Sequence, residues 1–104
     1  MTRQEILDAA SACVNGDRDE QYGRPENSFA LIARLWNDYL LGGPSKGSPA
    51  QMDIINVRDV AAMLALLKIA RIRGGGQKTH ADNWIDLAGY AACGGEIEGG
   101  TWNE

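Results

Sequence analysis

The segment from Val57 to Ile72 constrains the possible folds more than any other part of the sequence. Its apolar residues recur at helical spacing, and they cover almost the whole circumference of the helix rather than a single stripe. Such a helix is expected to be surrounded by neighbours. Its longest uninterrupted apolar stretch, Val60–Leu67, is about half of the roughly 20 residues that a membrane-spanning helix needs. We therefore predict that this helix is the centre of a soluble domain.

The chain has the length and composition of one helical domain. Its 104 residues are enough for one hydrophobic core but not for two, and 44% of them are hydrophobic. No run alternates apolar and polar residues in the manner of a β-strand. We predict an all-α fold, a compact bundle of about four helices around the central apolar helix. Residues 1–95 form the single predicted domain, and residues 96–104 form a glycine-rich, acidic tail.

Two helices are predicted before the central one. The first begins at Thr2, whose hydroxyl caps it while Glu5 reaches back in a capping box, and it ends at Asn15–Gly16. The second begins at Pro25, whose fixed φ suits the first helical position. Each helix carries one apolar stripe at helical spacing. The stripes consist of Ile6, Ala9, Ala10, Cys13 and Val14 in the first helix and of Phe29, Ile32, Ala33, Trp36 and Leu40 in the second.

The central helix and a last helix complete the predicted bundle. Asn56 is the expected cap of the central helix, which ends at Gly74–Gly76 after a basic last turn. The last helix is expected to begin at Asp82, a carboxylate cap, and to run to about Cys93, where Gly94–Gly95 closes it. Its predicted inward face consists of Trp84, Leu87, Ala88 and Ala91.

Charge and cysteine content exclude several classes of function. The net charge of −4 would repel a phosphate backbone, so direct nucleic-acid binding is not expected. Cys13 and Cys93 lie far apart in a chain with one histidine, which is not a zinc framework, and both are expected to be free thiols. The N-terminus lacks the apolar region of a secretory signal. The sequence therefore favours a cytoplasmic protein without a membrane partner.

An acid pair on the last helix is the first candidate for a site. Asp82 and Asp86 are four residues apart, so both carboxylates lie on one helical face, with Tyr90 one turn further along. Such oxygen ligands suit Mg²⁺, which takes one or two protein carboxylates together with waters and substrate phosphates. The alternative is structural: Asp82 caps the helix, and Asp86 pairs with a cation. Mg²⁺ is the cofactor that the first interpretation implies.

Basic residues of the central helix are expected opposite this acid pair. If the last two helices are antiparallel, positions equidistant from the centre of their loop lie at the same level. Lys68 then falls beside Asp86, and Arg71 falls near Trp84. A Lys68–Asp86 ion pair would satisfy both charges at the interface. The same bases could equally bind a metal-bound phosphate, so the contact is either a salt bridge or a ligand site.

Other polar residues have two interpretations as well. Asp59 and Glu26 stand in the first turns of helices, where they either stabilise the helix dipole or serve as further metal ligands. In the loop before Pro25, Arg18 and Tyr22 could recognise a base or a phosphate, or the loop is an ordinary solvated turn. The candidate ligand-binding residues are Lys68, Arg71, Arg18, Tyr22 and Tyr90, and the candidate metal ligands are Asp82, Asp86, Asp59 and Glu26.

Three blocks of the sequence carry a resemblance to known families. The blocks are Asn15-Gly16-Asp17-Arg18 with Gln21-Tyr22-Gly23, Pro25-Glu26-Asn27 and Phe29, then Asp59-Val60-Ala61 with Leu67-Lys68-Ile69-Ala70-Arg71, and then Asp82-Asn83-Trp84-Ile85-Asp86-Leu87-Ala88-Gly89-Tyr90-Ala91. Their combined order resembles a small all-helical family of unknown function from phages and prophages. The last block is also similar to nucleotide-modification-associated helical domains of phages. More remotely, the acid pair resembles MazG-type nucleotide pyrophosphohydrolases, which hold Mg²⁺ between two helices, although their Glu-Glu-x-x-Glu cluster does not occur here.

The residues and the resemblance lead to two hypotheses of function. The first is a phage-type protein that binds a nucleotide or another phosphate-containing ligand, with Mg²⁺ on Asp82 and Asp86 and with Lys68 and Arg71 on the phosphates. Any hydrolysis would then use a metal-activated water. The second is a non-enzymatic protein that binds and inhibits a host factor, such as a CRISPR or other defence component. In either case a homodimer is expected, because a second copy would cover the central apolar helix.

Overall fold

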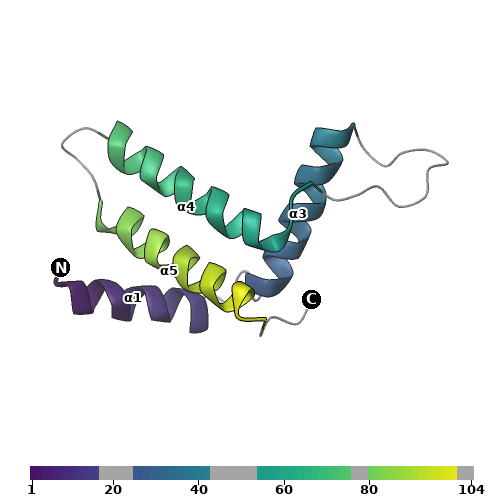
Figure 1. Cartoon of the computed structure of the whole chain (residues 1–104). Helices are drawn as coiled ribbons and strands as arrows, with labels where there is room; N and C mark the ends of the chain where they lie inside the picture. Colours follow the sequence, from purple (N-terminus) through teal and green to yellow (C-terminus); the bar gives the residue numbers. More distant parts are fainter. Residues whose placement is uncertain (17–24, 43–53, 76–79, 101–104) are drawn as a thin grey trace.

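The computed structural model describes residues 1–16, 25–42, 54–75 and 80–100. These residues form four helices and no strand, which confirms the predicted all-α fold. The helices are α1 (Arg3–Asn15), α3 (Pro25–Leu41), α4 (Val57–Gly74) and α5 (Ala81–Glu98) (Figure 1).

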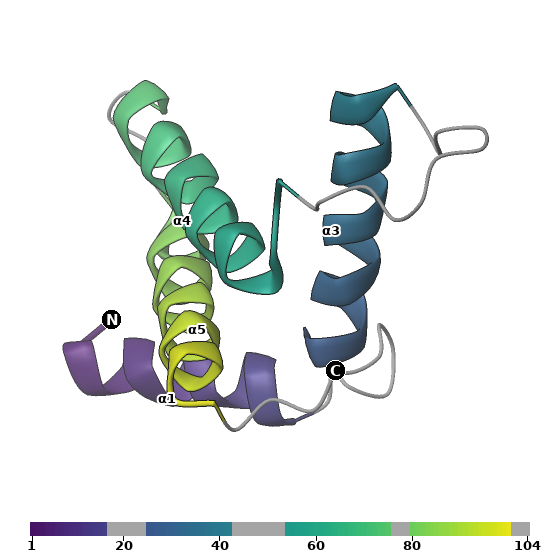
Figure 2. The same cartoon turned by 45° about the vertical axis from the view of Figure 1, so that its right-hand side comes forward.

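The middle position in the fold belongs to α5 and not to α4. Helix α5 lies between α1 and α4, with α4 antiparallel to it, and α3 crosses near the N-terminal end of α4 (Figures 1 and 2). The main core is built where α3, α4 and α5 meet. Its buried residues are Phe29, Ala33, Val57, Val60, Ala61 and Cys93. Both cysteines are free thiols, as predicted, although Cys93 is buried and Cys13 is only partly so.

The prediction that the apolar helix is surrounded by neighbours was wrong. Helix α4 buries Val60 and Ala61 against α5 and α3, whereas its opposite side is open. Four large apolar side chains there are between 40% and 61% exposed, namely Met63, Leu66, Leu67 and Ile69. The reason is geometric, because α5 covers one side of α4 along its length while α3 reaches only one end. Neither α4 nor any other described helix has the apolar length that crossing a bilayer requires.

The predicted starts of α1 and α4 are confirmed, and both are capping boxes. The hydroxyl of Thr2 accepts a hydrogen bond from the backbone N–H of Glu5, whose carboxylate accepts one from the backbone N–H of Thr2, both at 3.1 Å. Hydrogen bonding from Thr2 to this carboxylate, chiefly from the backbone N–H, holds the pKa of Glu5 below its usual value. The same reciprocal pair joins Asn56 and Asp59 at 3.0 Å in each direction. Each box satisfies two backbone N–H groups that a helix start leaves unpaired.

Both ends of α5 differ from the prediction. The N-cap is His80, whose side chain makes no capping bond, so Asp82 stands inside the first turn instead of capping it. The helix also continues through Gly94–Gly95 to Glu98 and thus includes the start of the predicted tail. A Cβ added to Gly94 would lie 3.5 Å from the Cβ of Ala61. The glycine therefore lies where α5 and α4 pack closely, and this packing continues the helix past a residue that usually ends one.

The predicted antiparallel register of α4 and α5 is confirmed by two ion pairs. Lys68 Nζ lies 2.9 Å from Asp86 Oδ2, and these side chains are only 10% and 17% exposed. Nearer the other end, Arg58 Nη1 lies 3.4 Å from Glu98 Oε1 in an exposed pair. In both pairs the two residues are almost equidistant from the centre of the intervening loop, as the sequence argument required.

The side chain of Asn37 on α3 is hydrogen-bonded to the residues that precede α4. This role was not predicted from the sequence. Asn37 is 4% exposed. The side-chain oxygen accepts hydrogen bonds from the backbone N–H groups of Ile54 and Ile55 at 2.9 and 2.7 Å, and Nδ2 donates to the carbonyl of Ile55 at 2.8 Å. The amide thus satisfies three backbone groups at the start of α4, so this single residue sets where α3 meets α4.

Replacement of Lys68 by Met should destabilise the fold by about 2 kcal/mol, because the carboxylate of Asp86 would remain in the helix interface without its cation. In a domain of this size that loss lowers Tm by roughly 10 °C. Thermal and urea unfolding followed by circular dichroism measure the effect. The double variant Lys68→Met/Asp86→Leu should recover most of the stability, since it removes both charges. A single variant as stable as the original chain would show that the pair does not hold α4 to α5.

Replacement of Asn37 by Leu should cost about 2 kcal/mol, because three partly buried backbone groups would lose their partner. Hydrogen exchange should show lost protection of the Ile54 and Ile55 amides before amides in the middle of α5 are affected. Asn27→Leu is the matched control, because Asn27 lies on the same helix and is exposed. Equal effects of the two substitutions would contradict the role assigned to Asn37.

Candidate functional site

The predicted acid pair lies in the first two turns of α5, and its two members differ in environment. Asp82 is exposed, whereas the carboxylate of Asp86 is largely buried against Lys68. The ion pair that the sequence offered as the structural alternative is therefore present. The Lys68–Asp86 ion pair neutralises one base and one acid of the predicted ligand site. Of the two acids, Asp82 and Asp86, only Asp82 is left with an accessible carboxylate.

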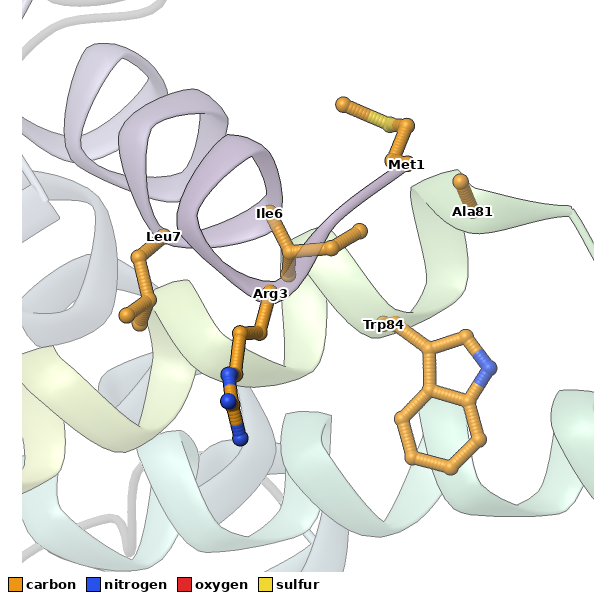
Figure 3. A pocket seen from close by; sticks show the side chains of 6 residues that line it. All are labelled: Met1, Arg3, Ile6, Leu7, Ala81 and Trp84. Atoms are coloured by element: carbon orange, nitrogen blue, oxygen red, sulfur yellow. The ribbon is translucent and has the colours of Figure 1, made fainter.

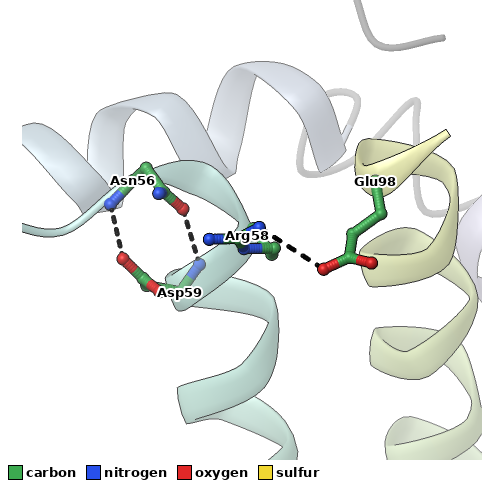
Figure 4. A network of polar contacts seen from close by, with 4 residues as sticks. All are labelled: Asn56, Arg58, Asp59 and Glu98. Atoms are coloured by element: carbon green, nitrogen blue, oxygen red, sulfur yellow. Dashed lines mark hydrogen bonds and ion pairs between the residues drawn. The ribbon is translucent and has the colours of Figure 1, made fainter. Parts of the chain in front are cut away.

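Asp59 belongs to a different part of the molecule. It completes the capping box at the start of α4, beside the Arg58–Glu98 ion pair (Figure 4). In the antiparallel register this level is about 14 residues along α5 from Asp82, roughly 20 Å at 1.5 Å per residue. Asp59 therefore does not join the acid pair. In the parts of the chain that the structure describes, no three His, Cys, Asp or Glu side chains are grouped as a metal site would require.

The remaining predicted residues are also separated. Tyr90 is half-buried, and its ring packs against Phe29 with a centroid distance of 6.3 Å and an interplanar angle of 43°, so it belongs to the core between α5 and α3. Arg71 is exposed on α4, one turn beyond Lys68. Arg18, Tyr22 and the side chain of Glu26 lie outside the described residues. The members of the predicted set that the structure brings into direct contact are Lys68 and Asp86.

An open pocket between the starts of α1 and α5 was not predicted. It has a volume of about 540 Å³ and is lined by Met1, Arg3, Ile6, Leu7, Ala81 and Trp84. Trp84 was expected to face inward but is 50% exposed, and Figure 3 shows its indole beside the pocket with Arg3 on the neighbouring helix. We call this the Trp84 pocket. Sequence reasoning missed it because no local pattern indicates that α1 packs on α5.

A second apolar surface runs along the outside of α3. Leu31, Leu35 and Tyr39 are four residues apart in turn, so they form one line on the helix. They are 51%, 55% and 86% exposed. The line, which we call the α3 stripe, lies away from the side that buries Phe29 and Ala33. Its spacing is readable in the sequence, but the inward pattern of the same helix is stronger and hides it.

Comparison with known protein families matches residues 5–98 to a family described as a domain of unknown function, DUF6378. No solved structure shows significant similarity to the chain. The matched range includes all of α3, α4 and α5 and most of α1, so the family match covers nearly the whole described fold.

Two relatives are phage proteins. The chain is 37% identical over 90 residues to the Gene 55 protein of Mycobacterium phage D29, an alignment that covers 86% of this chain and 51% of the relative. It is likewise 37% identical over 86 residues to the Gene 55 protein of Mycobacterium phage L5, covering 83% of this chain and 47% of the relative. The chain thus spans about half the length of these relatives.

The resemblance to a small phage family of unknown function is therefore confirmed, whereas none of these comparisons supports the more remote likeness to MazG-type enzymes. The extent of the match, from near the start of α1 to the last turn of α5, decides the assignment: the chain belongs to the DUF6378 family.

Proposed function

We propose that the protein acts by binding another protein through the α3 stripe. The observation that carries this proposal is the exposure of Leu31, Leu35 and Tyr39 in one line on a single helix. Large apolar side chains scattered singly over a surface are ordinary, but a continuous line of them marks a contact surface. An amphipathic helix that presents anchors at i, i+4 and i+8 fits an apolar groove of a partner.

The composition of the α3 stripe suits protein recognition. Tyr39 offers a large ring and a hydroxyl, the combination that is enriched at protein interfaces. The exposed Arg34 and the half-buried Asp38 lie along one edge of the stripe, so its apolar residues have a polar border on that side. A partner would therefore need an apolar groove that accepts leucine and tyrosine side chains and has polar groups at its edge.

A host factor is the partner class that we propose. The family match and the phage origin of the relatives support an action inside an infected cell. A small protein that covers a functional surface of a host enzyme or defence component can inhibit it without any catalysis of its own. The proposed activity is therefore occupation of a host protein, and the α3 stripe is the part that makes contact.

The test is capture of a partner from a bacterial lysate by the full chain and by matched variants. A stoichiometric partner should bind the original chain, and Leu35→Glu should weaken its binding at least tenfold, because a charge would enter the apolar contact. Ala12→Glu is the control, because it places the same carboxylate on an exposed residue of α1, outside the α3 stripe. A partner held equally by both variants would contradict the proposal.

A second candidate function rests on the Trp84 pocket. The indole of Trp84 and the guanidinium of Arg3, which line the same pocket from two helices, could hold a phosphate-containing ligand with an aromatic group, such as a nucleotide, by stacking on Trp84 and by pairing a phosphate with Arg3. Asp82 is exposed at the same end of α5 and could add Mg²⁺ to such a complex. This candidate keeps the nucleotide-like ligand that was predicted from the sequence. It places the ligand at Trp84 and Arg3 and not at Lys68 and Asp86, which bind each other.

Calorimetric titration with nucleoside mono- and triphosphates, with and without Mg²⁺, tests this candidate. Binding should fall at least tenfold in Trp84→Leu and in Arg3→Ala, because each removes one of the two contacts. It should persist in Arg58→Ala, a control on α4 that lies beside the opposite end of α5. A requirement for Mg²⁺ should disappear in Asp82→Ala. The candidate fails if no nucleotide binds the folded chain.

A further inference from the structure

The open side of α4 is an apolar face with an ordered charge pattern. Its exposed residues in the two central turns are all uncharged, namely Ala62, Met63, Leu66, Leu67, Ile69 and Ala70. We call them the α4 face. Asp59 precedes the face in sequence, and Arg73 follows it. A charge-free centre thus separates a negative residue at one end from a positive residue at the other.

The residues along the middle of this face follow the spacing of a coiled-coil seam. Asp59, Met63, Leu66, Ala70 and Arg73 are separated by four, three, four and three residues. This alternation places every member on one line of the helix, over about 21 Å at 1.5 Å per residue. The line is also symmetric about its midpoint, because Leu66 is seven residues from either charged end.

A line with this symmetry complements itself when two copies run antiparallel. A two-fold axis through Leu66 brings that residue against its counterpart, since the same patch is used by both copies in such a contact. Met63 then faces the region of Ile69 and Ala70 of the second copy. Asp59 faces Arg73 of the second copy at each end of the seam. We propose that the chain forms a homodimer through an antiparallel α4–α4 contact centred on Leu66.

The charged ends give this contact its direction. In a parallel arrangement of two copies, Asp59 would lie against Asp59 and Arg73 against Arg73, which places like charges together. The antiparallel arrangement replaces both repulsions with opposite-charge pairs. Arg73 has no carboxylate partner within the described residues, and one carboxylate oxygen of Asp59 is used by the capping bond from Asn56. The second carboxylate oxygen of Asp59 and the guanidinium of Arg73 thus meet across the proposed interface.

The size of the α4 face sets the expected strength. The seam from Asp59 to Arg73 spans about four turns of one helix, so the area buried lies at the small end of specific interfaces, where association is weak. We expect a dissociation constant in the micromolar range and a protein that shifts from monomer to dimer as its concentration rises. This inference does not depend on the proposed host partner, because that proposal uses the α3 stripe.

Sedimentation velocity of the full chain from about 1 to several hundred micromolar tests the dimer. Leu66→Glu should weaken association at least tenfold, because it places two carboxylates on the two-fold axis. Leu35→Glu, which changes an equally exposed leucine on α3, should leave association unchanged. A chain that stays monomeric over the whole range would overturn the proposal, and so would equal losses in both variants.

A charge exchange tests the direction of the contact. Asp59→Lys and Arg73→Glu should each weaken self-association severalfold, because each creates two like-charge pairs. An equimolar mixture of the two variants should associate more strongly than either alone, because both ends of the mixed dimer then pair opposite charges. A mixture no stronger than the separate variants would overturn the antiparallel register, provided that circular dichroism shows both chains folded.

A cross-link gives a second measurement that needs no change to the capping box. Leu66→Cys should form a covalent dimer when a mild oxidant such as oxidised glutathione removes the two thiol hydrogens, since the two sulfurs meet at the axis. The original chain, with Cys13 and Cys93 only, and Leu35→Cys should form far less under the same conditions. Equal cross-linking in the three proteins would contradict a contact centred on Leu66.

Discussion

The close antiparallel contact between α4 and α5 is the constraint on which the rest of the fold depends. Gly94 packs close to Ala61 where the two helices meet, and the Lys68–Asp86 ion pair lies within their interface at the predicted register. Helix α5 can then receive α1 on its other side, where Gly89 lies close to Val14. Because α5 has neighbours on both sides, α4 keeps one side open, and the surfaces available for function follow from this arrangement.

The sequence predicted features that depend on local rules. The capping box of Thr2 and Glu5 and the one between Asn56 and Asp59 use short-range chemistry, and both occur. The pairing of Lys68 with Asp86 was also predictable, because two antiparallel helices joined by a short loop bring residues equidistant from its centre to about the same level. Features that depend on packing between helices could not be predicted from the sequence. The continuation of α5 through Gly94 follows from packing on α4, and no helix-stop rule contains that information.

The candidate site was harder to predict than the fold, because identical side chains serve structure and binding. The acids of the predicted metal set stand where a helix start or an ion pair needs a carboxylate, which describes Asp59 and Asp86. Asn37 is the opposite case. Nothing in the sequence distinguishes it from an exposed polar residue of a helix, yet its side chain is buried and hydrogen-bonded to the residues that precede α4. The Trp84 pocket required knowledge that α1 lies on α5, a contact between segments about 80 residues apart.

An apolar helix with one open side and a separate apolar line on α3 together suggest how such a small protein could bind tightly. The α4 face and the α3 stripe belong to different helices, so a dimer formed through the first would present two copies of the second. When two linked sites bind one target or two neighbouring targets, the second contact forms at a high effective concentration. A modest α3 contact would then gain strength without added area. In such a dimer, the exposed apolar residues of α4, which this bundle does not bury, would contribute to binding strength.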